Sequence, residues 1–258
     1  MTDFLDTLAM DAKKTINSGY YNIELSAKQP KVSLKQAILD CKGNAVITEI
    51  KAASPSLGTI RTEVNAKEIA QTMARAGAVG ISVLTEPQHF QGSLSALLQA
   101  REATVLPILM KDIVIVAEQI EVAAQLGVNA VLLIQALFDR RYCEMSTEKT
   151  IAYAHSKGLE VLLEAHTETE FKVAVETDAD LVGVNNRNLA TLQIDLETTR
   201  RILGKQGKHG KIVISESGVK TQCDMQFLRD CGADAFLVGS SIMSSADVEG
   251  KIREFVQA

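Results

Sequence analysis

A short phrase of small and apolar residues recurs four times along the chain. Each copy opens with a turn that contains glycine or aspartate and continues as a run of apolar, often β-branched residues. A helical pattern precedes each copy, and a helix that turns into a buried strand is half of a βαβ unit. The turns lie 50, 51 and 54 residues apart, at Gly77, Gly127, Asp178 and Gly232. The helical patterns cover residues 66–76, 114–126, 167–176 and 221–231.

Four further apolar runs lie between these phrases, at residues 45–51, 105–111, 158–164 and 211–217. The resulting strands alternate with helices at about 25 residues per unit, which is typical of a (β/α)8 TIM barrel. An open, doubly wound sheet ranks second, because no G-x-G-x-x-G motif follows any strand. We therefore predict an α/β protein with a catalytic (β/α)8 barrel at residues 45–258. Residues 1–44 are predicted to form an N-terminal helical extension packed on the barrel.

The composition of the 258-residue chain agrees with one large core, since 46% of its residues are hydrophobic. Its formal net charge is −5, so the chain has no global attraction to nucleic acid or to an anionic membrane. An anionic ligand must then be held locally, by a few cations and backbone N–H groups. We predict that the protein binds neither nucleic acid nor a membrane. We also predict a monomer or weak homodimer.

The cysteines and histidines predict a reducing compartment and no metal site. None of the four cysteines forms a C-x-x-C pair, and the four histidines show no H-x-x-x-H pattern. No run approaches the roughly 20 apolar residues that a membrane span needs. The N-terminus carries Asp3, Asp6 and Asp11 and has no apolar secretory core. These features predict a cytoplasmic protein.

Polar residues follow the predicted strands where a barrel places its substrate. Strand residues point alternately inward and outward, so polar residues at the C-terminal ends face one common site. A single Lys or Glu there could simply mark where the strand meets water, but five ionisable residues at four strand ends indicate acid–base chemistry. Glu86 is a weaker candidate, because a loop residue in solvent is equally expected there. The strand-end residues are Glu49, Lys51, Lys111, Glu164 and Glu216, joined by Asn185 and Arg187.

Two Gly-Ser segments predict a phosphate site. Glu216-Ser217-Gly218 and Gly239-Ser240-Ser241 follow the seventh and eighth strands, the common phosphate location in such barrels. Small residues let the backbone approach the phosphate, serine adds a hydroxyl donor, and a helix N-terminus adds its N–H groups. Ordinary turns are the alternative, but the pairing of the two segments favours phosphate. Ser54, after the first strand, offers a further hydroxyl. We therefore predict a small phosphorylated molecule as the ligand.

Taken in order, these residues resemble the indole-3-glycerol phosphate synthase family of tryptophan biosynthesis. The likeness runs from about residue 45 to residue 243, and the ordered set is specific although each motif alone is weak. The matching segments are Glu49-Ile50-Lys51-Ala52-Ala53-Ser54-Pro55-Ser56, Leu84-Thr85-Glu86 with Phe90-Gln91-Gly92-Ser93, Pro107-Ile108-Leu109-Met110-Lys111-Asp112, Leu163-Glu164-Ala165-His166, Gly183-Val184-Asn185-Asn186-Arg187-Asn188-Leu189 and the two Gly-Ser segments.

The resemblance implies a carboxy-lyase reaction that needs no cofactor and no metal. The family closes 1-(2-carboxyphenylamino)-1-deoxy-D-ribulose 5-phosphate to indole-3-glycerol phosphate, with loss of carbon dioxide and water. Attack on the ribulose carbonyl builds negative charge on its oxygen, so an acid must lie beside it. The resemblance makes Lys111 this general acid and Glu164 an acid–base residue. Glu49 and Lys51 match an adjacent pair, in which Lys51 meets the substrate carboxylate or serves as a second acid.

The same resemblance implies the remaining site residues. Which of Lys51 and Lys111 protonates which oxygen stays open. Asn185 and Ser217 complete the catalytic set. The predicted phosphate contacts are Ser54, Gly218, Gly239 and Ser240, with Glu216 and Arg187 also assigned to substrate binding. The predicted slot for the anthranilate ring is Phe90, Leu132, Leu189 and Leu237. The chain departs from residues common in the family at Ala52, Leu57, Ile113 and Asn188.

Two other functions compete with this one. A phosphoribosylanthranilate isomerase would need Cys and Asp at the strand ends, where this chain has Lys and Glu. A catalytically silent barrel would keep the Gly-Ser segments and lose the Lys and Glu residues, but both sets are present.

Overall fold

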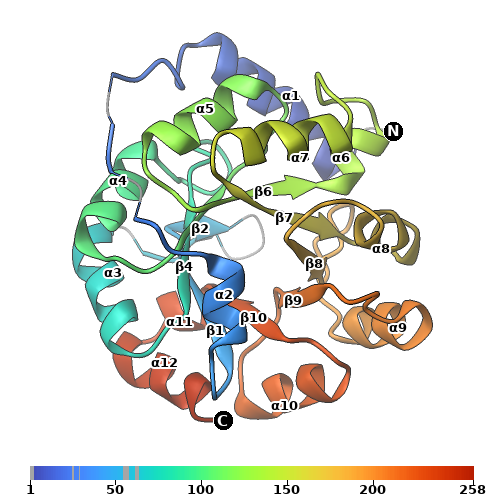
Figure 1. Cartoon of the computed structure of the whole chain (residues 1–258). Coiled ribbons are helices and arrows are strands. Elements are labelled where there is room, and N and C mark those ends of the chain that lie inside the picture. The colour runs from blue at the N-terminus through green and yellow to red at the C-terminus, as the bar shows by residue number, and fades with distance from the viewer. Residues whose placement is uncertain (1–2, 25, 29, 55–57, 62–63) are drawn as a thin grey trace.

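Parallel strands pair side by side and close into a barrel in the order β1-β10-β9-β8-β7-β6-β5-β4 (Figure 1). The computed structural model describes residues 3–24, 26–28, 30–54, 58–61 and 64–258. Ile47 of β1 closes the circle, because it pairs with Leu237 of β10 on one side and Gly80 of β4 on the other. The predicted (β/α)8 barrel is confirmed. Its strands are β1 (Ala45–Ile50), β4 (Gly80–Leu84), β5 (Ile108–Lys111), β6 (Ala130–Ile134), β7 (Glu160–Ala165), β8 (Leu181–Asn185), β9 (Ile212–Glu216) and β10 (Ala235–Val238).

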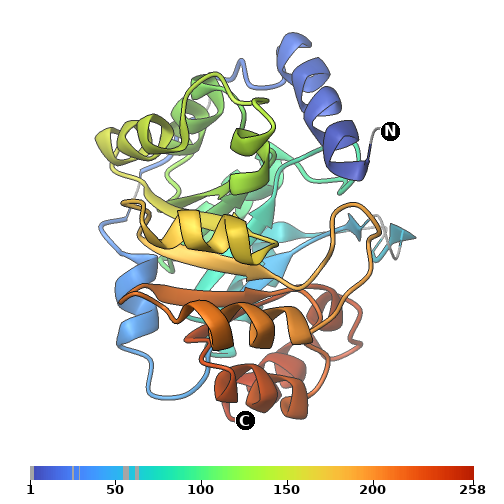
Figure 2. The same ribbon diagram turned by 90° about the vertical axis from the view of Figure 1, so that its right-hand side faces the viewer.

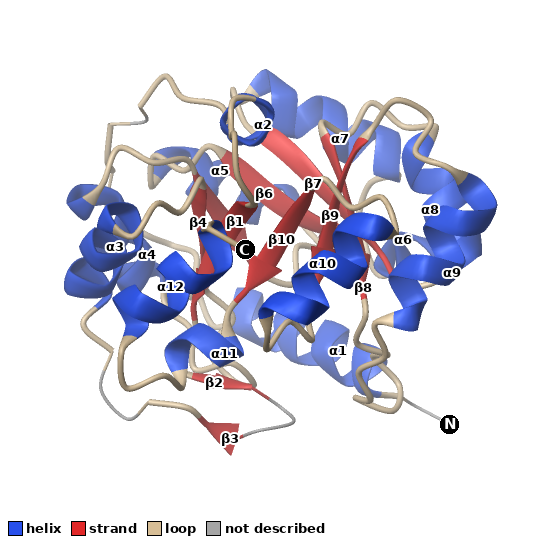
Figure 3. Ribbon diagram, turned by 90° about the horizontal axis from the view of Figure 1, so that it is seen from below, coloured by secondary structure: helices blue, strands red, loops and turns tan. Residues whose placement is uncertain are grey.

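Helices follow the strands and surround the barrel (Figure 3). Many begin where a polar side chain accepts a backbone N–H of the first turn, as those of Asn65, Ser93 and Thr221 do. The helices predicted before the repeated phrases are confirmed to within three residues, as α3, α5, α8 and α10. Across the described ranges, no helix is long and apolar enough to span a bilayer. The helices after β1 are α3 (Ala66–Arg75), α4 (Leu94–Ala103), α5 (Ala117–Gln125), α6 (Gln135–Asp139), α7 (Thr147–Ser156), α8 (Glu168–Val175), α9 (Glu197–Gln206), α10 (Gln222–Asp230), α11 (Ser240–Met243) and α12 (Val248–Val256).

Strand residues alternate between two hydrophobic cores. Ala45 and Ile47 of β1 belong to the core inside the barrel, whereas Val46 belongs to the core between the strands and the helices. The period-two alternation of a strand brings Glu49 to the same face as Ile47, one step closer to the C-terminal end. The inward positions thus change from apolar to polar along β1, which places the chemistry at the C-terminal end of the barrel.

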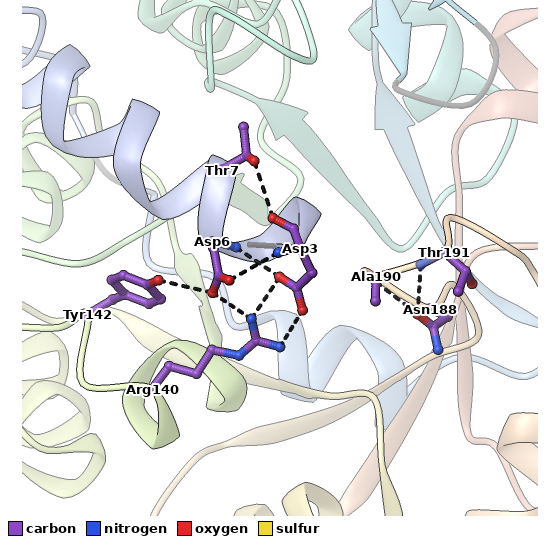
Figure 4. Close-up of polar contacts among 8 residues, drawn as sticks. All are labelled: Asp3, Asp6, Thr7, Arg140, Tyr142, Asn188, Ala190 and Thr191. Atoms are coloured by element: carbon purple, nitrogen blue, oxygen red, sulfur yellow. Dashed lines mark hydrogen bonds and ion pairs between the residues drawn. The ribbon is translucent and has the colours of Figure 1, made fainter. Parts of the chain in front are cut away.

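The first helix lies at the C-terminal mouth of the barrel. Figure 2 shows α1 (Phe4–Asn17) on the same side as the loops that follow the strands. Arg140, directly after α6, fixes it there, because its guanidinium lies 2.7 Å from a carboxylate oxygen of both Asp3 and Asp6 (Figure 4). These ion pairs hold α1 against the barrel.

The second helix lies at the opposite end of the barrel, on the left of Figure 2. The backbone N–H of Leu34, the first residue of α2 (Leu34–Leu39), donates to Glu160 at the start of β7 over 2.7 Å. Leu34 itself is fully buried and packs into the core inside the barrel. The extension therefore reaches both ends of the barrel.

The loop after β1 contains a small hairpin that the hydrophobic pattern did not predict. β2 (Ala53–Ser54) pairs antiparallel with β3 (Gly58–Thr59), and the hairpin projects beyond the barrel in Figure 3. Pro55, Ser56 and Leu57, which belong to the family motif or its departures, lie outside the described residues.

Candidate active site

A cavity of about 450 Å³ opens at the C-terminal ends of the strands, with Leu8 of α1 in its wall. This volume suits a small-molecule ligand. Of the sixteen predicted site residues, all but Ser54 line it. Ser54 is buried in β2, outside this lining, so its phosphate contact stays a prediction. The predicted residues in the lining are Glu49, Lys51, Phe90, Lys111, Leu132, Glu164, Asn185, Arg187, Leu189, Glu216, Ser217, Gly218, Leu237, Gly239 and Ser240.

Lys111 lies between two carboxylates at the floor of the cavity. Its Nζ is 3.1 Å from Oε2 of Glu164 and 3.2 Å from Oε2 of Glu216. Both glutamates are almost fully buried, with 2% and 1% of their surfaces exposed. A second ion pair joins Lys51 to Glu49 over 2.5 Å. The strand ends therefore form one cluster of acids and bases, as the sequence predicted for their common face.

The two carboxylates beside Lys111 differ in their affinity for a proton. Burial, together with repulsion from Glu164, raises the pKa of Glu216 to about 8. The attraction of Lys111 opposes this shift. Burial alone would also raise the pKa of Glu164, but Lys111 and His166 together hold that pKa below its usual range. The surroundings thus favour the ionised form of Glu164, whereas burial favours the protonated form of Glu216.

The ammonium of Lys111 persists although it is largely removed from water. Burial alone would lower the pKa of Lys111, but the charges of Glu164, Glu216 and Glu49 raise it above its usual range. The site thus holds a cation that can donate a proton beside a carboxylate that can accept one. Neighbouring groups with such separated pKa values are the arrangement that acid–base catalysis uses.

Two glycines leave the space that these carboxylates occupy. A Cβ at Gly183 of β8 would collide with Oε1 of Glu216, and a Cβ at Gly239 would collide with Oε1 of Glu49. A larger residue at either position must displace a carboxylate, because the added Cβ would take the place of a carboxylate oxygen.

Gly183→Ala is expected to lower kcat by roughly 10- to 100-fold, because a catalytic group displaced by about 1 Å loses its productive geometry. Steady-state kinetics check this result. The control is Gly204→Ala in α9, where an added Cβ would meet nothing within 4 Å. Alanine stabilises a helix relative to glycine, so this control should keep full activity and equal or higher stability. Wild-type kcat in Gly183→Ala would show that the position of Glu216 does not affect turnover.

The other end of the cavity is formed by the turns after β9 and β10. Ser217 and Gly218 have φ angles of 65° and 101°. A left-handed conformation is strained for serine, and such strain is typical of functional sites. Asn186 holds this turn, since its Nδ2 donates to the carbonyls of Glu216 over 3.0 Å and Ser217 over 3.1 Å. The strained turn is therefore fixed by buried hydrogen bonds.

Two lysines line this end of the cavity, Lys220 after β9 and Lys251 in α12. Neither lies directly at a strand end, so the strand-end pattern missed both. Lys251 pairs with Glu254 over 2.9 Å. Small residues, serine hydroxyls and two cations together make this the end of the cavity that suits an anion.

The family model of indole-3-glycerol phosphate synthase matches residues 6–255 of the chain. The chain belongs to the indole-3-glycerol phosphate synthase family. The synthase of Methanocaldococcus jannaschii is 43% identical over 234 residues, which cover 89% of this chain and 85% of that protein. The synthase of Neisseria meningitidis serogroup B is 42% identical over 208 residues, or 81% and 78% of the two chains. The family predicted from the strand-end motifs is confirmed, and the isomerase alternative is wrong.

More distant solved structures share the barrel fold of this indole-3-glycerol phosphate synthase family member. A thiamine phosphate pyrophosphorylase of Pyrococcus furiosus superimposes with a TM-score of 0.61 at 15% identity, over 86% of this chain and 96% of that one. An N-acetylmannosamine-6-phosphate 2-epimerase of Clostridium perfringens gives 0.62 at 15% identity, over 84% and 93%.

Glu86 is a buried loop anchor in this synthase family member. Only 3% of its surface is exposed, so a solvated loop position is wrong for it. Its carboxylate accepts the backbone N–H groups of Gln88, His89 and Phe90 over 2.9, 2.7 and 3.0 Å. Glu86 therefore shapes the loop that carries Phe90 into the cavity wall.

Asp112, next to Lys111, ties the N-terminal extension to β5. Its Oδ2 accepts the hydroxyl of Tyr21 over 2.9 Å, and its Oδ1 accepts its neighbour's backbone N–H, that of Ile113, over 2.7 Å. Burial raises the pKa of Asp112 to about 6. The sequence motif contained Asp112, but nothing in the pattern showed that Tyr21 reaches it.

Asn188, a predicted departure from the family pattern, supplies an acceptor to the loop after β8. Its Oδ1 accepts the backbone N–H groups of Ala190 over 2.8 Å and Thr191 over 3.0 Å (Figure 4). The amide oxygen alone supplies both of these turn contacts.

Proposed function

We propose that this chain is an indole-3-glycerol phosphate synthase, a carboxy-lyase of tryptophan biosynthesis. The observation that carries this proposal is the Lys111 ammonium beside the ionised Glu164, at the mouth of a barrel of the synthase family. The substrate is 1-(2-carboxyphenylamino)-1-deoxy-D-ribulose 5-phosphate, and the products are indole-3-glycerol phosphate, carbon dioxide and water.

The first step forms the new carbon–carbon bond. The ring carbon that bears the carboxylate attacks the ribulose carbonyl carbon, and the carbonyl electron pair moves to oxygen. Lys111 protonates that oxygen, so no free alkoxide has to form in a site that is partly shielded from water. The bond to the carboxylate then breaks, its electrons restore the aromatic ring, and carbon dioxide leaves.

The second step is a dehydration. Glu164 removes a proton from the carbon beside the ring nitrogen, while the hydroxyl leaves as water with a proton from an ammonium group. Lys51 and Lys111 both line the cavity and can serve here. Because a carboxylate departs as carbon dioxide, the reaction takes up one proton from solvent in each turnover.

The substrate carries a charged phosphate and an apolar ring, and the cavity wall has a polar part and an apolar part to match. The phosphate is assigned to Gly218, Gly239 and Ser240, with Lys220 and Lys251 nearby in the wall. The anthranilate ring is assigned to the slot of Phe90, Leu132, Leu189 and Leu237, to which the structure adds Leu8 and Ile113. Arg187 and Glu216 complete the proposed substrate contacts, and Asn185 and Ser217 the catalytic set.

The decisive test is turnover of the purified chain with this carboxyphenylamino-deoxyribulose phosphate. Product formation is followed by indole fluorescence and by release of carbon dioxide. The expected result is both signals in equal amounts. Heat of binding without either signal would support the silent barrel instead.

We propose a cytoplasmic location and a monomer or weak homodimer. The four cysteines are free thiols, which suits a reducing compartment. Sedimentation at several protein concentrations measures the oligomeric state, and a tight dimer at nanomolar concentration would contradict it.

A further inference from the structure

His166 lies behind Glu164, on the side away from Lys111. Its Nε2 is 3.1 Å from Oε1 of Glu164, whose Oε2 faces Lys111. Its Nδ1 is 3.5 Å from Oε2 of Glu170 in α8, and the same oxygen accepts the backbone N–H of His166 over 2.8 Å. Glu164 therefore lies between two basic groups, and the imidazole lies within ion-pair distance of two carboxylates.

This row of groups is removed from water. The side chains of Glu164, His166 and Glu170 are 2%, 9% and 13% exposed. Burying an ionised carboxylate lowers the stability of the protein unless nearby cations and hydrogen-bond donors compensate for the lost hydration. Lys111 is shared, because its Nζ also lies 3.2 Å from Oε2 of Glu216.

The charges around His166 favour its protonated form. Burial alone would lower the pKa of His166, but Glu164 and Glu170 raise it to about 9. Among the described residues, the charged groups facing this row are Glu170 from α8, Lys111 from β5 and Glu216 from β9. Glu49 from β1 acts on it through Lys111. An imidazolium here supplies the second positive charge that keeps Glu164 ionised.

We propose that His166 is a positioning residue which, paired with Glu170, keeps Glu164 ionised and turned toward Lys111. The inference rests on the proposed function, because it assigns His166 a role through the base of that reaction. His166 is not in the cavity lining, so its influence passes through Glu164.

The sign of the pH effect follows from this arrangement. His166→Gln removes a cation beside Glu164, so the pKa of Glu164 rises and the acidic limb of kcat moves to higher pH. Glu170→Gln removes an anion beside His166, so the pKa of His166 falls. The imidazolium is then lost at a lower pH, which a titration of the imidazole reports directly.

The kinetic test compares His166→Gln and Glu170→Gln with the wild-type enzyme across pH. We expect the acidic limb of His166→Gln to move up by about one pH unit or more, since one pKa unit is a tenfold change in an ionisation constant. A smaller upward shift is expected for Glu170→Gln, in which the imidazole remains. At neutral pH, kcat of His166→Gln should fall about tenfold with little change in KM. The matched control is His155→Gln, because His155 pairs with Asp180 over 2.8 Å at the opposite end of the barrel. It should leave the pH profile unchanged.

A second measurement does not need turnover. The chain has four histidines, so the ¹⁵N imidazole signals of the wild-type protein can be titrated, and His166 identified by its absence in His166→Gln or by its shift in Glu170→Gln. A His166 signal that titrates near its ordinary value of about 6.5, or an unmoved pH profile, overturns the proposal. Absence of wild-type turnover would instead contradict the proposed function, while the titration would still report on His166.

Discussion

Lys111→Met is expected to lower kcat by at least about 10²-fold, the usual scale for the loss of a general acid. Methionine keeps much of the length of lysine and removes the charge, so the barrel core is little disturbed. The variant loses the proton donor, and the carboxylates of Glu164 and Glu216, 3.1 and 3.2 Å from the native ammonium, lose the cation that they share. Initial rates at saturating substrate measure the change.

The control for this variant is Lys208→Met. Lys208 pairs with Asp234 over 2.6 Å near the start of β10, with 38% and 31% of the two side chains exposed. Exposed pairs contribute about 0–1 kcal/mol, so this variant should keep full activity. A near-normal kcat in Lys111→Met would remove Lys111 from the acid role. If Lys51→Met then gave the larger loss, Lys51 would be the carbonyl acid, which settles the choice that the sequence left open.

Glu164→Gln is expected to lower kcat by about 10²- to 10⁴-fold, because the amide keeps the shape of the side chain but cannot accept the proton of the dehydration step. Rates should fall at low pH in the wild-type enzyme as this carboxylate is protonated. Because Lys111 and His166 hold the pKa of Glu164 below its ordinary value of 4.5, that fall should lie below pH 4.5. In Glu164→Gln this dependence should vanish. Initial rates across pH measure both effects.

Glu160→Gln is the matched control, since Glu160 begins the same strand that Glu164 ends. Its carboxylate accepts the N–H of Leu34 over 2.7 Å and the hydroxyl of Ser33. This variant should loosen α2 and lower the melting temperature, yet leave kcat unchanged. Equal losses of kcat in both variants would mean that the charge of Glu164 acts through stability and not through catalysis.

Much of this site is visible in the sequence because barrels obey a simple rule. Strand residues alternate inward and outward, so Glu49 and Lys51, Glu164 and Glu216 could be assigned to one mouth from their places at the ends of apolar runs. The family resemblance rests on the same residues. The period-two rule also places His166 beside Glu164, two residues further along the chain, so the sequence carries a signal for this neighbour as well.

Other features depend on which distant segments meet. Nothing local in the sequence tells that Glu86 is buried, that Tyr21 reaches Asp112, or that α1 and α2 lie at opposite ends of the barrel. Those contacts join residues far apart in the chain. The free energy that each polar contact contributes depends on how deeply it is buried.

The sequence by itself determined the order of the elements, the barrel and the identity of the groups at its mouth. These properties follow from hydrophobic period and strand direction, which are local. Only the tertiary structure decided which of those groups lie beside one another, and hence the direction in which each pKa is shifted. Lys111 between Glu164 and Glu216, with His166 behind Glu164, separates the pKa values of two chemically identical carboxylates. Charge interactions grow strong only when the groups are close and shielded from water, and that proximity exists only in the folded barrel.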